Sequence, residues 1–204
     1  MVSVFTRSAD FSPVELSLSS AEWCGHVYHK LRFRSDGLQE DLWSYFEDES
    51  RSRRLESPAN GVVEDALFIL LRGLKGDYLG PGDKRTVPFL SGMLEDRLRH
   101  GMLEWTTAEI ERAVEPDAVH VPAGPLRNAA LYVVRVAGGR TGRFWVEPDG
   151  RRRIVKWTWT GPGTDAEASE AGELAGTLRE AYWKFNGPGN EKQLRRLGLT
   201  PVVP

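Results

Sequence analysis

The clearest pattern in the chain is the alternation of apolar and polar residues from Glu22 to Arg34. A period of two places alternate side chains on opposite faces of a β-strand, whereas a helix would scatter them around its circumference. The face predicted to pack into the core carries Trp23, Val27, Leu31 and Phe33. The opposite face carries Cys24, His26, Tyr28 and Arg32. This stretch therefore predicts a half-buried strand.

A second strand is predicted directly after this one. Residues Ser35 to Gly37 are typical of a tight turn, in which the glycine adopts a positive φ. The return strand, Leu38 to Phe46, places Trp43 and Tyr45 on one face and apolar residues on the other. The two strands together predict a long β-hairpin.

The middle of the chain has weaker patterns. The segment Glu47 to Asn60 mixes acids and bases and ends in a proline and an asparagine, which is typical of an exposed connection. The segment Val62 to Leu74 has apolar residues at helical spacing and predicts the main helix. Within Leu103 to Val114 a strand is favoured, because the two adjacent threonines prefer extended structure.

The last third of the chain predicts a β-meander. Its strands are Leu131 to Val136, Gly142 to Glu147 and Ile154 to Thr160, joined by glycine-containing turns in which Gly150 has a positive φ. A further strand is predicted within Ala171 to Trp183, and a short helix within the last 15 residues.

Composition supports the same class. A chain of 204 residues with 40% hydrophobic residues can form a single domain over residues 1–204. Its 7 Trp, 21 Gly and 12 Pro favour short aromatic strands joined by tight turns. We therefore expect a mainly β fold, either a curved antiparallel sheet or a lipocalin-like β-barrel, with one main helix and a short C-terminal helix. No apolar run is long enough to predict a transmembrane segment.

Catalytic chemistry has one candidate pair, Cys24 and His26. Side chains two apart on one strand lie about 7 Å from each other, so this pair alone does not bring a thiol to its base. A packing role for Cys24 is therefore favoured over a nucleophilic one. Neither a spaced Cys/His set nor a phosphate loop followed by a helix occurs, so we predict no metal and no cofactor.

Nucleic-acid binding is not favoured either. Arg151 to Arg153 stand close to Trp157 and Trp159, a combination that can hold phosphates and stacked bases. A net charge of −2, however, gives no general attraction to a polyanion. We interpret these arginines as part of an exposed turn and the tryptophans as core residues.

Several segments carry a resemblance to known proteins. "SSAEWCGHVYHKL", "VPAG", "GGRTGRFWVE" and "GTLREAYWKFNGPGNEKQLRRLGL" resemble a group of bacterial envelope proteins often labelled septum formation inhibitor Maf. The "SxSPRR" loop of true Maf nucleotide pyrophosphatases does not occur here, so that activity is not inferred. The later segments are similar to DUF3108-like domains, which implies a lipocalin-like or related β-barrel.

The resemblance also implies a location and a longer relative. Proteins of this group act in the cell envelope or periplasm and carry a signal segment and further strands ahead of the position of Met1. We therefore expect this chain to lack N-terminal strands of the longer form. Without a signal segment it would be cytoplasmic.

These observations favour a binding domain over an enzyme. The expected partner is an apolar or amphiphilic small molecule, or an envelope protein, and not a nucleic acid. The predicted ligand-binding residues are Cys24, His26, Tyr28, Arg32, Trp43, Tyr45 and Tyr182. The alternative hypothesis is a small-molecule hydrolase or other enzyme that uses Cys24 and His26.

Overall fold

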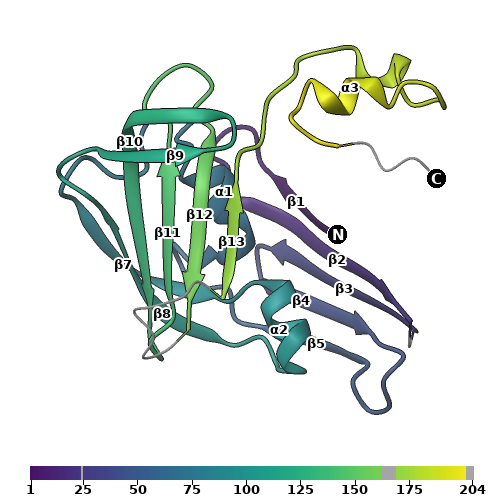
Figure 1. Ribbon diagram of the computed structural model, residues 1–204. Helices are drawn as coiled ribbons and strands as arrows, with labels where there is room; N and C mark the ends of the chain where they lie inside the picture. The colour runs from purple at the N-terminus through teal and green to yellow at the C-terminus, as the bar shows by residue number, and fades with distance from the viewer. Residues whose placement is uncertain (24, 162–168, 201–204) are drawn as a thin grey trace. The chain divides into compact units, whose positions relative to one another are not determined.

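The computed structural model describes residues 1–23, 25–161 and 169–200 (Figure 1). Strands account for 46% of the structure and helices for 11%. The mainly β class and the curved antiparallel sheet expected from the sequence are confirmed. The chain divides into two compact units. The first comprises Met1–Tyr78 and Arg85–Ile110, and the second comprises Leu79–Lys84 and the residues from Glu111 onward.

The first unit is built on a five-stranded sheet in the order β1-β2-β3-β4-β5 (Figure 1). Each strand pairs antiparallel with the one that follows it in the sequence, so every connection within this sheet is local. The strands are β1 (Val2–Thr6), β2 (Pro13–Glu22), β3 (Gly25–Arg34), β4 (Gly37–Trp43) and β5 (Arg51–Leu55). The predicted long hairpin is confirmed as β3 and β4, but the return strand ends at Trp43, so Tyr45 and Phe46 lie beyond it.

Strand β3 has the two faces that its alternation predicts. Val27 and Leu31 are almost fully buried, and Phe33 packs against the core of the first unit. Tyr28 and Arg32 are half-buried on the opposite face. The buried residues of that core are Leu16, Leu18, Leu31, Leu38, Val63, Ala66, Leu90, Met93 and Leu103.

The prediction that Trp23 packs into the core is wrong, because its side chain is fully exposed. Strand β2 ends at Glu22 and β3 begins at Gly25, so Trp23 lies in the turn between them. Gly25 has a φ of 151°, and the ring of Tyr45 lies against it. The alternation of β3 therefore stops at this turn and does not reach residue 23.

A second correction concerns the segment Glu47 to Asn60, which the sequence predicts as an exposed connection. It contains strand β5, which pairs with β4. The inward positions of β5 are Arg51 and Arg53, and both form ion pairs with the buried Glu40. A strand whose inward positions are charged shows no apolar period, so hydrophobic patterning does not detect it.

Short helices and further strands complete the first unit. They are β6 (Val62–Val63), η1 (Glu64–Ala66), α1 (Leu67–Leu70), β7 (Lys84–Leu90), α2 (Met93–Arg99) and β8 (Trp105–Arg112). The main helix predicted over Val62 to Leu74 is wrong in extent. Its first two residues pair in parallel with β7, an arrangement that β-branched valines favour, and helical turns remain from residue 64 to residue 70. The strand predicted within Leu103 to Val114 is confirmed as β8.

The second unit contains the predicted meander. Its elements are β9 (Asp117–Val121), β10 (Gly124–Val136), β11 (Thr141–Val146), β12 (Ile154–Thr160), β13 (Glu170–Glu173), η2 (Tyr182–Lys184) and α3 (Lys192–Arg195). Strands β10, β11 and β12 pair in sequence order, and the short C-terminal helix is confirmed as α3. The strand predicted over Ala171 to Trp183 is limited to β13. Beyond it the backbone at Gly176 approaches Leu197 instead of continuing along β12.

The correction at Trp23 yields a matched pair of variants. Replacing Trp159 with alanine should lower the free energy of unfolding by about 3 to 5 kcal/mol, because this ring is only 1% exposed and packs edge-on against Phe144. The same change at the fully exposed Trp23 should cost less than about 0.5 kcal/mol. Urea unfolding followed by circular dichroism measures both. Equal losses would contradict the two placements.

The two turn glycines also give a graded prediction. Gly37 and Gly150 have φ angles of 138° and 64°, so valine at either position should cost about 1 to 2 kcal/mol of stability. The larger loss is expected at Gly37, because a Cβ there would lie 2.9 Å from the carbonyl oxygen of Leu55, whereas none of the described atoms lies within 4 Å at Gly150. Scanning calorimetry checks the order. A larger loss at Gly150 would count against this steric account.

Candidate functional site

The candidate site is a cavity of about 550 Å³ within the first unit, called here the apolar cavity. It lies where the β1–β2 turn, the β3–β4 turn and the loop after β5 meet the segment from β6 to α1. Its apolar lining consists of Phe11, Pro13, Phe33, Pro58, Val62, Val63, Ala66, Leu70 and Trp105. Its polar lining consists of Arg7, Asp10, Ser12, Arg34, Ser35, Ser57, Asn60, Tyr78 and Arg85. A volume of this size is typical of small-molecule sites.

The β1–β2 turn places Phe11 in the cavity wall with an unusual backbone. Phe11 has a φ of 58°, a left-handed conformation that bulky residues rarely adopt. Two backbone hydrogen bonds hold it there, from the Phe11 N–H to the Arg7 carbonyl and from the Arg7 N–H to the Ser12 carbonyl, both 2.9 Å. Strained backbone of this kind is often found at ligand sites.

Asp10 stabilises the same turn from its side chain. Its Oδ1 accepts hydrogen bonds from the backbone N–H of Ser12 at 3.0 Å and from the Ser12 hydroxyl at 2.8 Å. These two hydrogen bonds lower the pKa of Asp10 below its ordinary value of 3.8. The carboxylate is therefore ionised at neutral pH, and it accepts both hydrogen bonds within the turn.

Trp105 forms a second wall, and its position is fixed at both ends of the ring. The indole N–H donates a 2.8 Å hydrogen bond to the carbonyl of Glu56, in the loop after β5. The far edge of the ring lies against Gly61, where a Cβ would approach it to 2.8 Å. Residue 61 must therefore be glycine for the ring to lie this close to the loop backbone.

The rim of the cavity carries arginines and a tyrosine. The guanidinium of Arg85 lies over the ring of Tyr78, 5.2 Å from its centroid. Burial raises the pKa of Tyr78 above its ordinary value of 10.0, and the nearby Arg85 opposes this rise only in part. Tyr78 is therefore a neutral hydroxyl at physiological pH. Arg7 and Arg34 lie at the same rim and are exposed.

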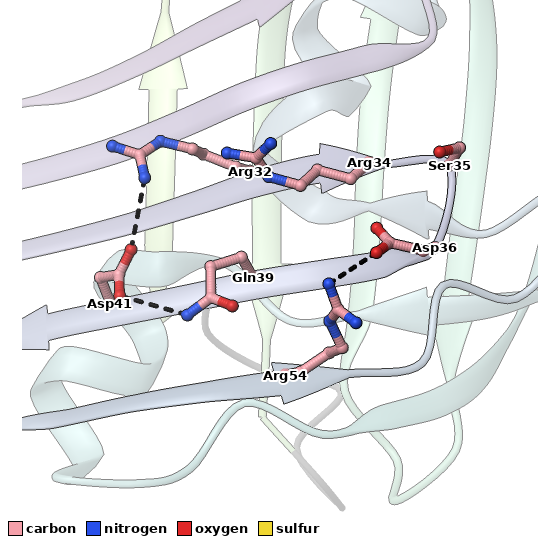
Figure 2. Close-up of a pocket in the computed structure, with 7 residues that line it drawn as sticks. All are labelled: Arg32, Arg34, Ser35, Asp36, Gln39, Asp41 and Arg54. Carbon is pink, nitrogen blue, oxygen red and sulfur yellow. Dashed lines mark hydrogen bonds and ion pairs between the residues drawn. The ribbon is translucent and has the colours of Figure 1, made fainter.

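A second depression, of about 570 Å³, lies on the outer face of the five-stranded sheet and is lined almost entirely by polar groups (Figure 2). Its lining residues are Arg32, Arg34, Ser35, Asp36, Gln39, Asp41 and Arg54. The guanidinium of Arg32 lies 3.6 Å from Asp41, and that of Arg54 lies 2.7 Å from Asp36. The four charges of these two pairs neutralise each other, and Arg34, which also lines the apolar cavity, has no ion pair among the described residues. This surface therefore offers a single uncompensated charge to a ligand.

A buried charge cluster lies between the sheet and α2 and is centred on Glu40. The fully buried carboxylate accepts from His29 Nε2 at 2.9 Å and forms ion pairs with Arg51 at 2.9 Å and with Arg53. Burial opposes ionisation of Glu40, but these three partners outweigh it and lower its pKa from 4.5 to about 2. Since an ionised carboxylate only accepts hydrogen bonds, His29 must donate from Nε2.

Asp96 on α2 lies at the edge of this cluster, and there the loss of water outweighs the attraction of the nearby cations. Its carboxylate is 3.6 Å from Arg51, a partner that Glu40 already holds at shorter distance. Burial raises the pKa of Asp96 above its ordinary value of 3.8, because the surrounding cations do not offset the loss of water. The cluster therefore favours ionisation of Glu40 and disfavours ionisation of Asp96.

The predicted ligand-binding residues are only partly brought together. Tyr28 stacks on Trp43 with ring centroids 5.7 Å apart, on the outer face of the sheet. His26 Nε2 lies 2.9 Å from the hydroxyl of Ser19 on β2. Cys24 lies outside the described residues. The hypothesis of catalysis by Cys24 and His26 therefore stays a prediction.

The other predicted residues lie elsewhere. Arg32 follows Tyr28 by four residues on β3 and lines the polar depression in Figure 2. The ring of Tyr45 packs against Gly25 beside the β2–β3 turn. Tyr182 belongs to the second unit and is 71% exposed. A role of these residues in binding is neither supported nor opposed by their contacts.

Sequence patterns missed the apolar cavity, because part of its wall comes from the β1–β2 turn, for which no element is predicted, and part from the segment Glu47 to Asn60, which is predicted as a connection. One usable signal was present in "DFSP", where a large apolar residue, Phe11, stands in an otherwise polar turn. Another was "SPANG", which places Asn60 and Gly61 next to each other in a turn-forming sequence. Neither signal indicates which distant segments the turns would meet.

Comparisons with known proteins do not assign the fold to a family: no family model, curated protein or solved structure matches the chain. Among the described residues, none of the helices is both long and apolar enough to cross a membrane. The same residues hold no group of three or more His, Cys, Asp or Glu side chains placed to bind a metal ion. The geometry of the apolar cavity is therefore the main support for a function.

The two carboxylates of the buried cluster predict variants of opposite sign. Glu40→Gln should lower the free energy of unfolding at pH 7 by about 3 kcal/mol or more, because Arg51 and Arg53 would lose the buried charge that pairs with them. Asp96→Asn should leave stability unchanged or raise it, because it removes a carboxylate whose ionisation is disfavoured. Urea unfolding at pH 7 measures both. A larger loss for Asp96→Asn than for Glu40→Gln would contradict this assignment.

The same cluster predicts a pH dependence. The folded-state pKa of Glu40 is lowered, so its ionised form stabilises the fold fully above the ordinary value of 4.5, and this contribution is lost as the pH falls from 4.5 toward about 2. The stability difference between the parent protein and Glu40→Gln should therefore shrink over that interval. Thermal unfolding of both proteins at a series of pH values checks this. A difference that stays constant down to pH 2 would rule out the ion pairs as its source.

Proposed function

We propose that the first unit is a binding module that holds an apolar or amphiphilic small molecule in the apolar cavity. One observation carries this proposal: a cavity of about 550 Å³ combines nine apolar lining residues with polar ones, among which Arg7, Arg34 and Arg85 are exposed. Binding sites for small molecules are typically built in this way, with an apolar interior and a few polar groups that orient the ligand.

The rigidity of the walls supports a ligand site over an incidental gap. The backbone of Phe11 is held by hydrogen bonds within its own turn, and the indole of Trp105 is fixed by a hydrogen bond to the carbonyl of Glu56 in the loop after β5. Val63 and Ala66 at the floor belong to the buried core of the first unit. A cavity with fixed walls does not have to order its side chains when a ligand enters, so less conformational entropy is lost on binding.

The amphiphilic character of the ligand follows from the distribution of the lining. The apolar side chains come from the floor and two walls, whereas Arg34 and Arg85 lie at strand ends near solvent. A ligand with an apolar body and a polar end would satisfy both regions. An envelope location and an envelope protein as a second partner, which the resemblance to envelope proteins implies, remain predictions that this site does not require.

A plugging variant tests the proposal on the full chain. N-phenyl-1-naphthylamine, an uncharged apolar dye, should bind with an increase in fluorescence. Leu70→Trp should weaken that binding at least about tenfold, because the larger ring fills a cavity that Leu70 lines. Leu74→Trp is the matched control, since Leu74 lies four residues further along the chain, just beyond α1, is 46% exposed and does not line the cavity.

Two outcomes would refute the proposed function. One is the absence of dye binding by the parent protein. The other is equal weakening by Leu70→Trp and Leu74→Trp, which would indicate that the dye binds elsewhere. Circular dichroism of each variant establishes that the fold is intact before the affinities are compared.

A further inference from the structure

The charges at the rim of the apolar cavity are unbalanced. Three arginines and one aspartate line the cavity, a formal surplus of two positive charges, although the whole chain has a net charge of −2. The aspartate, Asp10, is already bound by the N–H and the hydroxyl of Ser12 within its own turn. Its charge acts on Arg7, the rim arginine of the same turn, so Arg34 and Arg85 carry the surplus.

Arg34 is the least compensated of these arginines. It is the last residue of β3, it is exposed, and it forms no ion pair within the part of the chain that the structure describes. Figure 2 shows the contrast with its neighbours, since Arg32 is joined to Asp41 and Arg54 to Asp36, whereas no interaction is drawn from Arg34. An anion that binds Arg34 therefore breaks no existing ion pair.

Arg85 is partly immobilised at the same rim. Its guanidinium lies over the Tyr78 ring, 5.2 Å from the ring centroid, a cation–π contact that holds its charge at this edge of the cavity. The planar fork of N–H donors on a guanidinium matches the oxygens of a carboxylate or a phosphate. Less side-chain entropy is lost when such a group forms hydrogen bonds.

We propose that the apolar cavity selects amphiphiles with a single anionic headgroup, held at the rim by Arg34 and Arg85. This inference rests on the proposed function and adds the chemical class of the ligand. The carboxylate of a fatty acid and the phosphate of an alkyl phosphate share the required chemistry, namely a compact anion with oxygens that accept two parallel N–H bonds. The apolar chain would occupy the interior that Phe33, Leu70 and Trp105 line.

Headgroup discrimination tests this inference on the parent protein. Decanoate, decyl phosphate, decyl maltoside and decyltrimethylammonium carry the same chain, and each would be titrated below its micelle concentration to displace N-phenyl-1-naphthylamine. Both anions should displace the dye at concentrations about tenfold lower than the uncharged and cationic compounds, as expected for charge-assisted hydrogen bonds. The ratio between decanoate and decyl phosphate distinguishes a carboxylate from a phosphate ligand.

Charge-removing variants locate the preference. Arg34→Gln and Arg85→Gln should each reduce the affinity for decanoate about three- to tenfold and leave that for decyl maltoside unchanged. Arg54→Gln is the matched control, because Arg54 is an exposed arginine of β5, in the same sheet as Arg34, and does not line the apolar cavity. A general effect of net charge would weaken decanoate binding equally in all three variants.

The outcomes distinguish failure of the anionic preference from failure of the proposed binding function. If the dye binds, Leu70→Trp blocks it, and all four compounds displace it equally, the apolar cavity is a binding site and the anionic preference is wrong. If Arg54→Gln weakens decanoate as much as Arg34→Gln and Arg85→Gln do, the assignment to the rim is wrong. If the dye does not bind at all, the proposed function fails together with this inference.

Discussion

The first unit depends on a single buried carboxylate. Glu40 lies in the centre of β4 with no exposed surface, and it attracts Arg51 and Arg53 from the neighbouring strand. The same two guanidiniums reach beyond the sheet, where Arg51 donates to the carbonyl of Gly101 and Arg53 to that of Leu103. One negative charge therefore orders the pairing of β4 with β5 and ties both strands to the segment that leads into β8.

This arrangement also positions the apolar cavity. Trp105, the first residue of β8, follows Leu103 by two positions and forms a cavity wall. A shift of β5 by one residue would turn Arg51 and Arg53 to the outer face and leave the buried Glu40 with His29 alone and no cationic arginine, which is strongly unfavourable. The buried charges thus specify the register of β5, which apolar contacts alone would specify weakly. Because Trp105 follows the segment that these charges bind, its position in the cavity wall is fixed as well.

Strands in which apolar and polar residues alternate can be predicted from the sequence, whereas elements without this alternation cannot. The β3–β4 hairpin and the strands around Trp157 alternate cleanly, so their faces follow from a period of two. Strand β5 is not detected by this rule, because its inward residues are arginines. Trp23 is misplaced by it, because an alternating pattern does not show where a strand ends and a turn begins. The apolar cavity is least predictable, since its lining is assembled by turns far apart in the sequence, and no local pattern records that they meet.

Gly61 determines the position of one wall of the apolar cavity. The absence of one methyl group at this position lets the ring of Trp105 lie against the loop backbone. Any larger residue would push the ring away and redraw the wall, without touching the hydrogen-bonded core of the sheet. A substitution at this one position would therefore change the size of the cavity, at the cost of the contacts that Trp105 makes with the core of the first unit and with Glu56.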